Sequence, residues 1–347
     1  MILLREAQER DVEALLRFSQ IPGMFNLPTE PDPLRERIRK SLDAFSDKLS
    51  NKAESKYMFV AEELSSGRVL GTSSIAAQHG TPESPHFYFE VDNEQKFSET
   101  INTGFIHGTL KLKYDTNGPS ELGGLVMDPG YRASEKKIGR QISFVRFLYL
   151  GLHRNRFKKK LIAELLPPLN ERGQSPLWEA IGRRFTSMDY WEADHLCAQS
   201  KEFIFSLFPS GKIYTTFLTA EARNAIGRVG KSTEPVLHML KKIGFAYKNQ
   251  IDPFDGGPHL WVNVEDLLPL KRLMTLPIEP VDTETPSSGS EDGLITKAKA
   301  RPGTFRAVTA HAWVEGGKLR VASSEFQRFA SELEVQPGDS VAFMPYY

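Results

Sequence analysis

The sequence contains a single cysteine, Cys197, and no long run of apolar residues. One thiol excludes an internal disulfide and is typical of a protein from a reducing compartment. The absence of an apolar run of about 18 residues argues against a membrane-spanning helix. Residues 1–7 become charged too early for a signal peptide. These absences favour a soluble, cytoplasmic protein.

The chain also lacks an excess of charge of either sign. Lys+Arg and Asp+Glu both number 44, so the formal net charge is zero. A basic excess, which would indicate binding to nucleic acid or to an anionic membrane, is absent, so neither partner is expected. With 347 residues, of which 40% are hydrophobic and 25% charged, the chain has ample material for two or three globular domains.

The most informative stretch runs from residue 120 to residue 150. Apolar residues at 122 and 125–127 predict a short buried strand that contains Gly123 and Gly124. Two glycines inside a strand indicate a β-bulge or a place where a ligand lies close to the backbone. Asp128-Pro129-Gly130 then ends the strand in a turn.

A helix is predicted to follow this turn, beginning near Gly139. Ile138, Ile142 and Val145 recur at helical spacing. A helix N-terminus presents unpaired N–H groups and a partial positive charge, and Arg132 and Arg140 add formal charge beside it. This pattern suits a pyrophosphate. A strand–helix connection with a solvated basic loop remains the alternative.

The other predicted elements alternate between strands and helices. Asp11 is expected to cap an early helix, and residues 30–56 are expected to be helical. Residues 78–118 show no regular pattern. Strands are predicted at 2–4, 57–62, 69–75, 122–127, 160–165, 305–310, 318–321 and 340–344, and later helices from Ser175 and over 236–243 with a glycine end at Gly244.

The predicted elements follow an α/β order: strand, helix, hairpin, strand, phosphate-type turn, helix and strand. This order resembles that of the GNAT acyl-CoA transferases. In that family the fourth strand bulges and the next helix receives the cofactor pyrophosphate. The usual loop is Arg/Gln-x-x-Gly-x-Gly/Ala. Here Glu135 and Lys137 occupy the glycine positions after Arg132, and a glycine arrives only at Gly139, so the loop is two residues longer.

Several segments resemble the arginine N-succinyltransferases, a GNAT-related family, and the resemblance covers nearly the whole chain. The most distinctive is Phe-Asp-Gly-Gly-Pro at 254–258. The other segments, in order, are Ser120-Glu121-Leu122 with Leu125, Asp128-Pro129, Ser175-Pro176-Leu177-Trp178, Arg184-Phe185-Thr186-Ser187-Met188-Asp189, Ala193-Asp194, Leu196-Cys197, Ile213-Tyr214, Phe217-Leu218, Ile226-Gly227-Arg228-Val229, Gly244-Phe245 and Ile251-Asp252.

This resemblance implies an acyltransferase that moves succinyl from succinyl-CoA to the α-amino group of L-arginine in arginine breakdown. Succinyl-CoA would be the acyl donor, and no metal is expected. Two alternatives stay open. One is a non-catalytic or weakly catalytic CoA-binding subunit that assembles with a homologous chain, and the other is an acyltransferase for a different amine. Assembly as a homo- or hetero-oligomer is also open.

The expected architecture is a GNAT-like α/β (α+β) fold with a mixed, largely antiparallel sheet. Residues 1–168 would form an acyl-CoA-binding half, and residues 169–274 a second α/β half that completes the substrate cleft or represents a degenerate GNAT repeat. Residues 275–297, rich in Thr, Glu, Pro, Ser and Gly, are expected to be a linker. Residues 298–347 are expected to form a small β-rich appendix.

Amide formation from a thioester requires loss of a proton from the amine, stabilisation of an oxyanion and departure of a thiolate. The resemblance implies that Leu125, with the adjoining Val126, contacts succinyl-CoA through its main chain; the alternative is a core leucine. Glu121, at the start of the same strand, is the candidate base, although a solvated strand-end glutamate would look the same.

The family places a proton-donating histidine where this chain has Gly230. A glycine has no side-chain proton to give, so another group replaces the histidine or the step proceeds without a donor. Lys231 and His238 follow closely.

Recognition of a guanidinium group needs carboxylates, for which Asp189, Asp194 and Asp255 are the candidates. The alternative for Asp255 is a turn, and for the other two it is helix capping. Cys197 is interpreted as core filler rather than as a nucleophile, because no base partner is specified.

Overall fold

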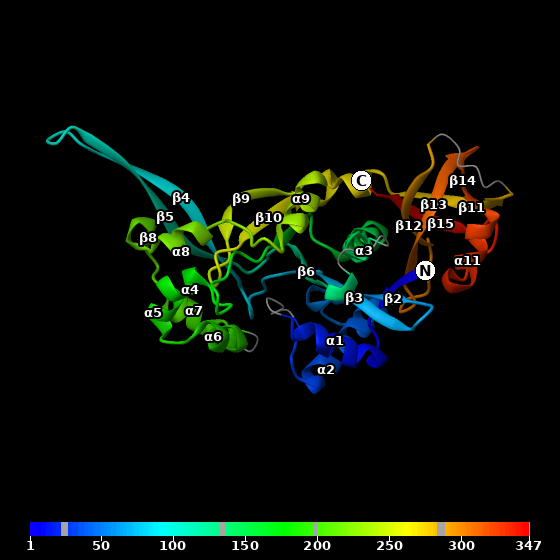
Figure 1. The fold of residues 1–347 in the computed structure, drawn as a ribbon, viewed down its shortest axis with the longest axis horizontal. Helices are drawn as coiled ribbons and strands as arrows, with labels where there is room; N and C mark the ends of the chain where they lie inside the picture. The colour runs from blue at the N-terminus through cyan, green and yellow to red at the C-terminus, as the bar shows by residue number, and fades with distance from the viewer. Residues whose placement is uncertain (22–26, 132–136, 198–199, 283–288, 347) are drawn as a thin grey trace. The chain divides into compact units, whose positions relative to one another are not determined.

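The computed structural model describes residues 1–21, 27–131, 137–197, 200–282 and 289–346 as intermixed helices and strands (Figure 1). Two compact units result, each assembled from separate segments. Unit 1 comprises Met1–Ala77, Ser120–Lys159 and Asn263–Tyr347, and unit 2 comprises Gln78–Pro119 and Lys160–Val262. These units do not coincide with the consecutive domains expected from the sequence, because the chain leaves unit 1 at residue 77 and returns to it at residue 120.

Unit 1 holds the predicted strand, helix, hairpin and glycine-containing strand. Its elements are β1 (Ile2–Glu6), α1 (Val12–Ser19), α2 (Pro31–Phe45), β2 (Lys56–Glu63), β3 (Arg68–Ala76), β6 (Ser120–Met127), α3 (Ile138–Leu152), α10 (Leu268–Lys271), β11 (Met274–Val281), β12 (Glu291–Lys297), β13 (Arg306–Glu315), β14 (Lys318–Ala322), α11 (Ser323–Leu333) and β15 (Ser340–Pro345). None of the helices in the described part of the chain has the length and apolar character needed to cross a lipid bilayer.

The central strand β2 is buried on both faces. Met58 and Val60 belong to a core cluster with residues of α1 and α2, whereas Phe59 packs edge-on against Tyr149 of α3, with ring centroids 5.5 Å apart. Because successive side chains of a strand point to opposite faces, this alternation places helices on both sides of the sheet. The sheet runs β1-β2-β3-β6 in this part of unit 1.

The C-terminal strands form a closed ring of five, because β12 pairs with both β13 and β15 while β11 and β14 complete the circuit. Figure 1 shows α11 beside these strands. Two of the strands, β11 and β12, come from the segment expected to be a linker, so that expectation is wrong for residues 275–281 and 291–297. The composition of this segment predicted a linker because it has weak strand character. Closure of the ring pairs every strand on both sides and stabilises such segments as strands.

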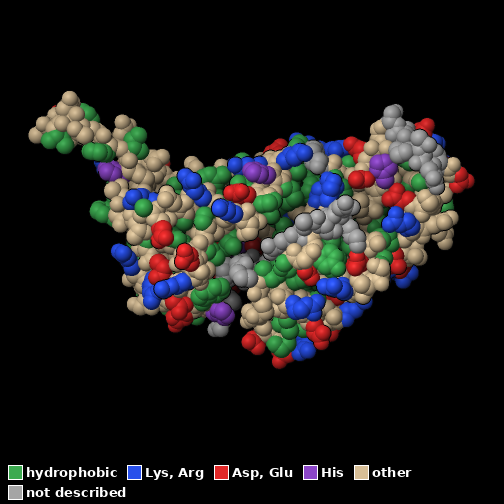
Figure 2. Space-filling model, viewed as in Figure 1, with side chains coloured by type: hydrophobic (Ala, Val, Ile, Leu, Met, Phe, Trp, Pro, Cys, Tyr) green, Lys and Arg blue, Asp and Glu red, His purple; other side chains and the backbone are tan. Residues whose placement is uncertain are grey.

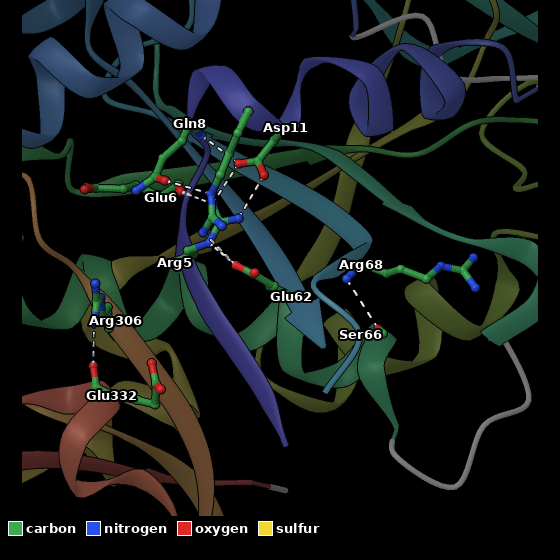
Figure 3. A network of polar contacts seen from close by, with 10 residues as sticks. Arg5, Glu6, Gln8, Asp11, Glu62, Ser66, Arg68, Arg306 and Glu332 are labelled. Carbon is green, nitrogen blue, oxygen red and sulfur yellow. Dashed lines mark hydrogen bonds and ion pairs between the residues drawn. The ribbon is translucent and has the colours of Figure 1, made fainter. Parts of the chain in front are cut away.

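A buried charge network ties β1 to β2 and to the start of α1 (Figure 3). The Arg5 guanidinium donates to both carboxylate oxygens of Asp11, at 2.7 and 2.8 Å, and through Nε to Glu62 at 2.5 Å. The Asp11 side chain therefore pairs with Arg5 and makes no cap hydrogen bond to α1, contrary to expectation. Glu6 is also buried, and burial raises the pKa of its carboxyl to about 7.

Unit 2 is built around a sheet ordered β7-β10-β9-β4-β5-β8. Its elements are β4 (His86–Ser98), β5 (Thr103–Asp115), β7 (Lys160–Glu164), α4 (Pro176–Ala180), α5 (Gly182–Thr186), α6 (Tyr190–Cys197), α7 (Glu202–Leu207), β8 (Lys212–Tyr214), α8 (Ala220–Ala225), α9 (Glu234–Lys242), β9 (Ala246–Ile251) and β10 (Pro258–Asn263). The Ser175 side chain caps α4 by accepting the Trp178 N–H at 3.0 Å, as predicted. The glycine end of α9 is also confirmed, since Gly244 has a φ of 114°.

The long hairpin of β4 and β5 was not predicted from the sequence. Its strands pair with each other over their full length, but β9 and β8 flank them only near residues 89–90 and 109–111. The hairpin end is therefore a two-stranded ribbon, and it carries apolar side chains (Figure 2). Those that are between 60% and 71% exposed are Phe97, Ile101, Phe105 and Ile106.

Candidate active site

The predicted bulge is present in β6. Thr72 of β3 pairs with Val126, but Ser74 pairs with Gly123, so one residue of β3 faces two of β6. Gly124 adopts a left-handed φ of 57°, which a side chain disfavours. A Cβ at this position would also lie 3.1 Å from Ser74 Oγ. Both features explain why glycine occupies the bulge.

The residues of β6 alternate between buried and half-buried. Val126 packs in the core with α1 and α2, whereas Leu125 is half-buried and does not belong to that cluster. A partly covered leucine side chain is compatible with a ligand contact through the Leu125 main chain. The interruption of the hydrogen-bond ladder falls at Gly124 and Leu125, where a main-chain N–H is best placed to meet a ligand oxygen.

The N-terminus of α3 lies next to the end of β6. A Cβ on Gly139 would lie 3.6 Å from the terminal methyl of Met127. The residue before the helix, Lys137, has a left-handed φ of 48° and makes no side-chain cap, so an anion could meet the first N–H groups of α3. The Arg140 guanidinium stacks on the Tyr346 ring at 4.1 Å. Arg132 lies outside the described residues.

Glu121 is half-buried on β6, and its carboxylate has a cationic neighbour. Arg37 of α2 interacts electrostatically with it: burial lowers the pKa of the Arg37 guanidinium, while the Glu121 charge opposes that shift. The Glu121 Oε1 atom also lies 3.3 Å from the Cβ position of Gly123. The carboxylate thus points along the strand toward the bulge.

In unit 2, Gly230 lies against the segment that follows β7. Its N–H donates to the Leu166 carbonyl oxygen at 2.9 Å. A Cβ on Gly230 would lie 3.0 Å from the Pro167 carbonyl oxygen, and the φ of Gly230 is not in the left-handed region. A larger residue would therefore be crowded by one carbonyl group but not strained in its own backbone.

Two of the family-like segments contact each other. The Trp178 ring stacks on Phe254 with centroids 4.9 Å apart and an interplanar angle of 3°. The Ser175 hydroxyl donates to the Asp255 carbonyl oxygen at 3.2 Å. The uncommon pentapeptide therefore forms the β9–β10 loop and packs on the capped start of α4.

Three carboxylates gather around this loop, namely Asp194, Asp252 and Asp255, which we call the acidic group. Burial, with repulsion from Asp252, raises the pKa of Asp255 well above its ordinary value, and Glu164 and Asp194 add to this shift. Burial, with repulsion from Glu164, raises the pKa of Asp252 to about 7. Burial raises the pKa of Asp194 to about 6. Clustered carboxylates that are partly shielded from solvent favour a cationic ligand.

The three predicted substrate aspartates have different environments. Asp255 Oδ1 accepts the Gly257 N–H at 2.7 Å, so the turn interpretation holds together with membership of the acidic group. Asp189 is exposed and accepts the Glu192 N–H at 2.8 Å, which is a helix-capping contact. Asp194 lies inside α6 and does not cap it. The structure brings together Asp194 and Asp255 but gives Asp189 a different role.

Sequence reasoning did not include Asp252 among the candidate substrate-binding aspartates, although the structure places it in the acidic group. Its carboxylate Oδ1 accepts the N–H groups of Phe254 and Asp255, at 2.7 and 3.1 Å. Its position two residues before the pentapeptide was the available signal. Cys197 also belongs to unit 2, and burial raises the pKa of its thiol to about 12, so it stays protonated and a poor nucleophile.

Comparison with known proteins gives a consistent result. Residues 2–268 match the model of the AstA family, described as arginine N-succinyltransferase beta subunit. An arginine N-succinyltransferase from Citrobacter koseri is 34% identical over 293 residues, covering 83% of this chain and 84% of that protein. Another from Escherichia fergusonii is 33% identical with the same coverage. The solved structure of arginine/ornithine succinyltransferase subunit AI from Pseudomonas aeruginosa has a TM-score of 0.82 at 26% identity and covers 99% of this chain and 98% of its own.

Proposed function

Since the chain belongs to the arginine N-succinyltransferase family, with its GNAT-like α/β fold, we propose that it transfers succinyl from succinyl-CoA to the α-amino group of L-arginine in the cytoplasm. The observation that carries this proposal is the bulge at Gly124, on the strand whose last residue, Met127, lies beside the start of α3 at Gly139. The bulge offers a main-chain donor for a thioester oxygen, and the helix offers donors for a pyrophosphate.

The reaction forms one C–N bond and breaks one C–S bond. The neutral amine attacks the thioester carbonyl, whose oxygen becomes an oxyanion. We assign the Leu125 main-chain N–H to that oxyanion, with Val126 and the start of α3 at Gly139 and Arg140 holding the rest of the CoA molecule. A main-chain donor that is fixed in advance stabilises developing charge without reorganisation.

The amine must lose one proton before attack and a second one after it. Glu121 is proposed as the acceptor, directly or through one water. The Arg37 guanidinium interacts electrostatically with this carboxylate. General base catalysis typically contributes about 10²–10⁴-fold, which is the range expected for Glu121.

The acidic group is the proposed binding site for the arginine guanidinium. Asp194 and Asp255 would pair with it, and Asp252 would add charge from the β9–β10 loop. A delocalised cation relieves the repulsion among these carboxylates and favours their ionised forms. Asp189 is left out of this set because its carboxylate caps α6.

Thiolate departure is the step that lacks an evident donor, since Gly230 has no side chain. An alkyl thiol has a pKa of about 8.5, so a thiolate can leave without prior protonation and take its proton from water. The proposed enzyme is therefore slower at this step than a relative with a histidine there, but it is not inactive.

The direct test is to mix purified protein with succinyl-CoA and L-arginine and to follow release of free CoA thiol. Arginine-dependent release with formation of succinylarginine supports the proposal. Acetyl-CoA and L-ornithine serve as alternative donor and acceptor. Release of thiol only with another pair would overturn the assignment of succinyl-CoA and arginine.

A second candidate is a CoA-binding subunit with little activity of its own, and two observations favour it. Gly230 replaces the family histidine, and the β4–β5 hairpin ends in exposed apolar side chains. A two-stranded ribbon alone is marginally stable in water, so an apolar end is best explained by contact with another chain. The similar Pseudomonas aeruginosa protein is itself described as subunit AI.

Mass measurement in solution separates these candidates when it is combined with the assay. A monomer or homo-oligomer with arginine-dependent turnover supports the first. CoA binding without turnover, and activity only after a homologous chain is added, would support the second.

A further inference from the structure

Three histidines of unit 2 surround one carboxylate. The Nε2 atoms of His86, His79 and His259 lie 3.2, 3.5 and 3.5 Å from the same oxygen, Oε1 of Glu164. The succinyl transfer proposed above assigns no catalytic or binding role to any of these four side chains. They come from four separate segments: the stretch after residue 77, the start of β4, the end of β7 and the start of β10.

The histidine rings also contact one another. The rings of His79 and His86 meet edge to face at 4.5 Å, and His86 stacks on His259 at 5.2 Å. His86 is 1% exposed; among the described residues, its Nδ1 has no hydrogen-bond partner, and its Nε2 faces only Glu164, without a well-formed hydrogen bond. A buried imidazole whose polar atoms are incompletely satisfied is costly, and a further ligand at Nε2 would offset part of that cost.

We propose that His79, His86 and Glu164 bind one divalent transition-metal ion of the zinc type. One nitrogen from each ring and one carboxylate oxygen lie within 4.8 Å of one another. Zn–N and Zn–O bonds of about 2.0–2.2 Å place tetrahedral ligand atoms about 3.4 Å apart. The separations of 3.2 and 3.5 Å from Glu164 therefore fit one ion with little movement.

The donor types favour zinc over calcium or magnesium, which prefer oxygen ligands only. Two imidazoles and one carboxylate leave a fourth position for water or for a further protein ligand. His259 is a candidate for this fourth position, because its Nε2 atom lies 3.5 Å from the same Glu164 oxygen. His259, Asp252 and Glu164 also form a second set of three donor groups. The ion would join β4, β7 and β10 within unit 2.

The proposal departs from the expectation that the protein needs no metal, and it stands apart from the proposed acyl transfer. Its test is metal content and coordination, which do not depend on turnover. The full chain, made without a polyhistidine tag, is loaded with Zn²⁺, dialysed and analysed for bound metal. About one zinc per chain is expected, and X-ray absorption should show at least two imidazole ligands.

Variants localise the site. His86→Gln is expected to weaken zinc binding at least about 100-fold. Loss of a residue that only orients a metal ligand weakens binding by about 10–100-fold. His238→Gln, which changes an exposed histidine of α9 in the same unit, is the matched control and should bind zinc as the parent does. If His86→Gln fails to fold, the zinc content and absorption spectrum of the parent chain decide the question alone. Less than about 0.1 zinc per parent chain, or equal binding by the two variants, would overturn the proposal.

Discussion

The main-chain N–H of Gly230 donates a hydrogen bond of 2.9 Å to the carbonyl oxygen of Leu166. The missing side chain would start beside the next carbonyl group, that of Pro167, at 3.0 Å. Gly230→His is predicted to destabilise the protein by about 1 kcal/mol, the low end of the effect of crowding. If thiolate departure limits turnover, kcat should rise about 10²-fold, because a proton donor is restored.

Gly230→Ala is the control for this change, since it adds the same Cβ without an imidazole. Thermal unfolding should shift equally in the two variants, while kcat should rise only in the histidine variant. An equal kcat for both would show that position 230 does not supply the limiting proton.

Asp194→Asn is predicted to raise the KM for arginine about 10-fold or more, because one charge-assisted hydrogen bond to the guanidinium group is lost. The pKa of Asp194 is raised to about 6 by burial, so its carboxylate ionises as pH rises through that value. Arginine binds the ionised form, and its affinity should therefore increase between pH 5 and 7 in the parent protein. This increase should be smaller in the variant.

Asp189→Asn, at the start of the same helix, is the matched comparison. Asn still accepts the Glu192 N–H, so the cap is kept and the KM should change less than about 2-fold. An equal rise in KM for both variants would mean that Asp194 does not contact arginine.

Glu6→Gln is predicted to remove part of the pH dependence of stability. Burial raises the folded-state pKa of Glu6 to about 7, from an ordinary value of 4.5. The folded state therefore holds the proton more tightly than the unfolded state does. Protonated Glu6 therefore adds to the free energy of unfolding. This contribution is complete below pH 4.5 and is lost as the pH rises through 7.

Chemical denaturation at pH 5 and pH 7.5 measures this effect. The loss of unfolding free energy between the two pH values should be smaller in Glu6→Gln than in the parent. Glu13→Gln changes an exposed glutamate of α1 and should leave the difference unaltered. The same difference in all three proteins would contradict the role given to Glu6.

Gly124→Ala is predicted to destabilise the protein by about 1–2 kcal/mol, because alanine disfavours a φ of 57°. Its Cβ would also press on Ser74 Oγ and disturb the bulge. CoA affinity should fall as a result. Gly67→Ala has a similar φ of 68° but no atom within 4 Å of the Cβ. It should cost similar stability and leave CoA affinity intact.

Local signals predicted much of unit 1. The bulge in β6, the start of α3 near Gly139 and the β2–β3 hairpin are each encoded by neighbouring residues, through glycine, proline and the spacing of apolar side chains. Family-like segments also located the β9–β10 loop and Asp255. The side chain of Val126 packs in the core, as the apolar residues of the predicted buried strand indicated.

The features that were missed depend on contacts between distant segments. Residues 291–297 form a strand only because β13 and β15 flank them. His79 and His86 belong to the stretch with no regular pattern, and they meet Glu164 and His259 only after folding. Asp252 stands two residues before the distinctive pentapeptide, but its burial and the repulsion from Glu164 become visible only in the folded chain.

The central claim is that β6 and α3 of unit 1 hold an acyl-CoA. Titration calorimetry with succinyl-CoA tests it most directly and does not require turnover. We predict saturable binding at one site per chain, with a Kd between about 1 μM and 1 mM, the range of typical substrate constants, and weaker binding by Gly124→Ala. Absence of binding by both CoA and succinyl-CoA at about 1 mM, by a protein shown to be folded, would contradict the account.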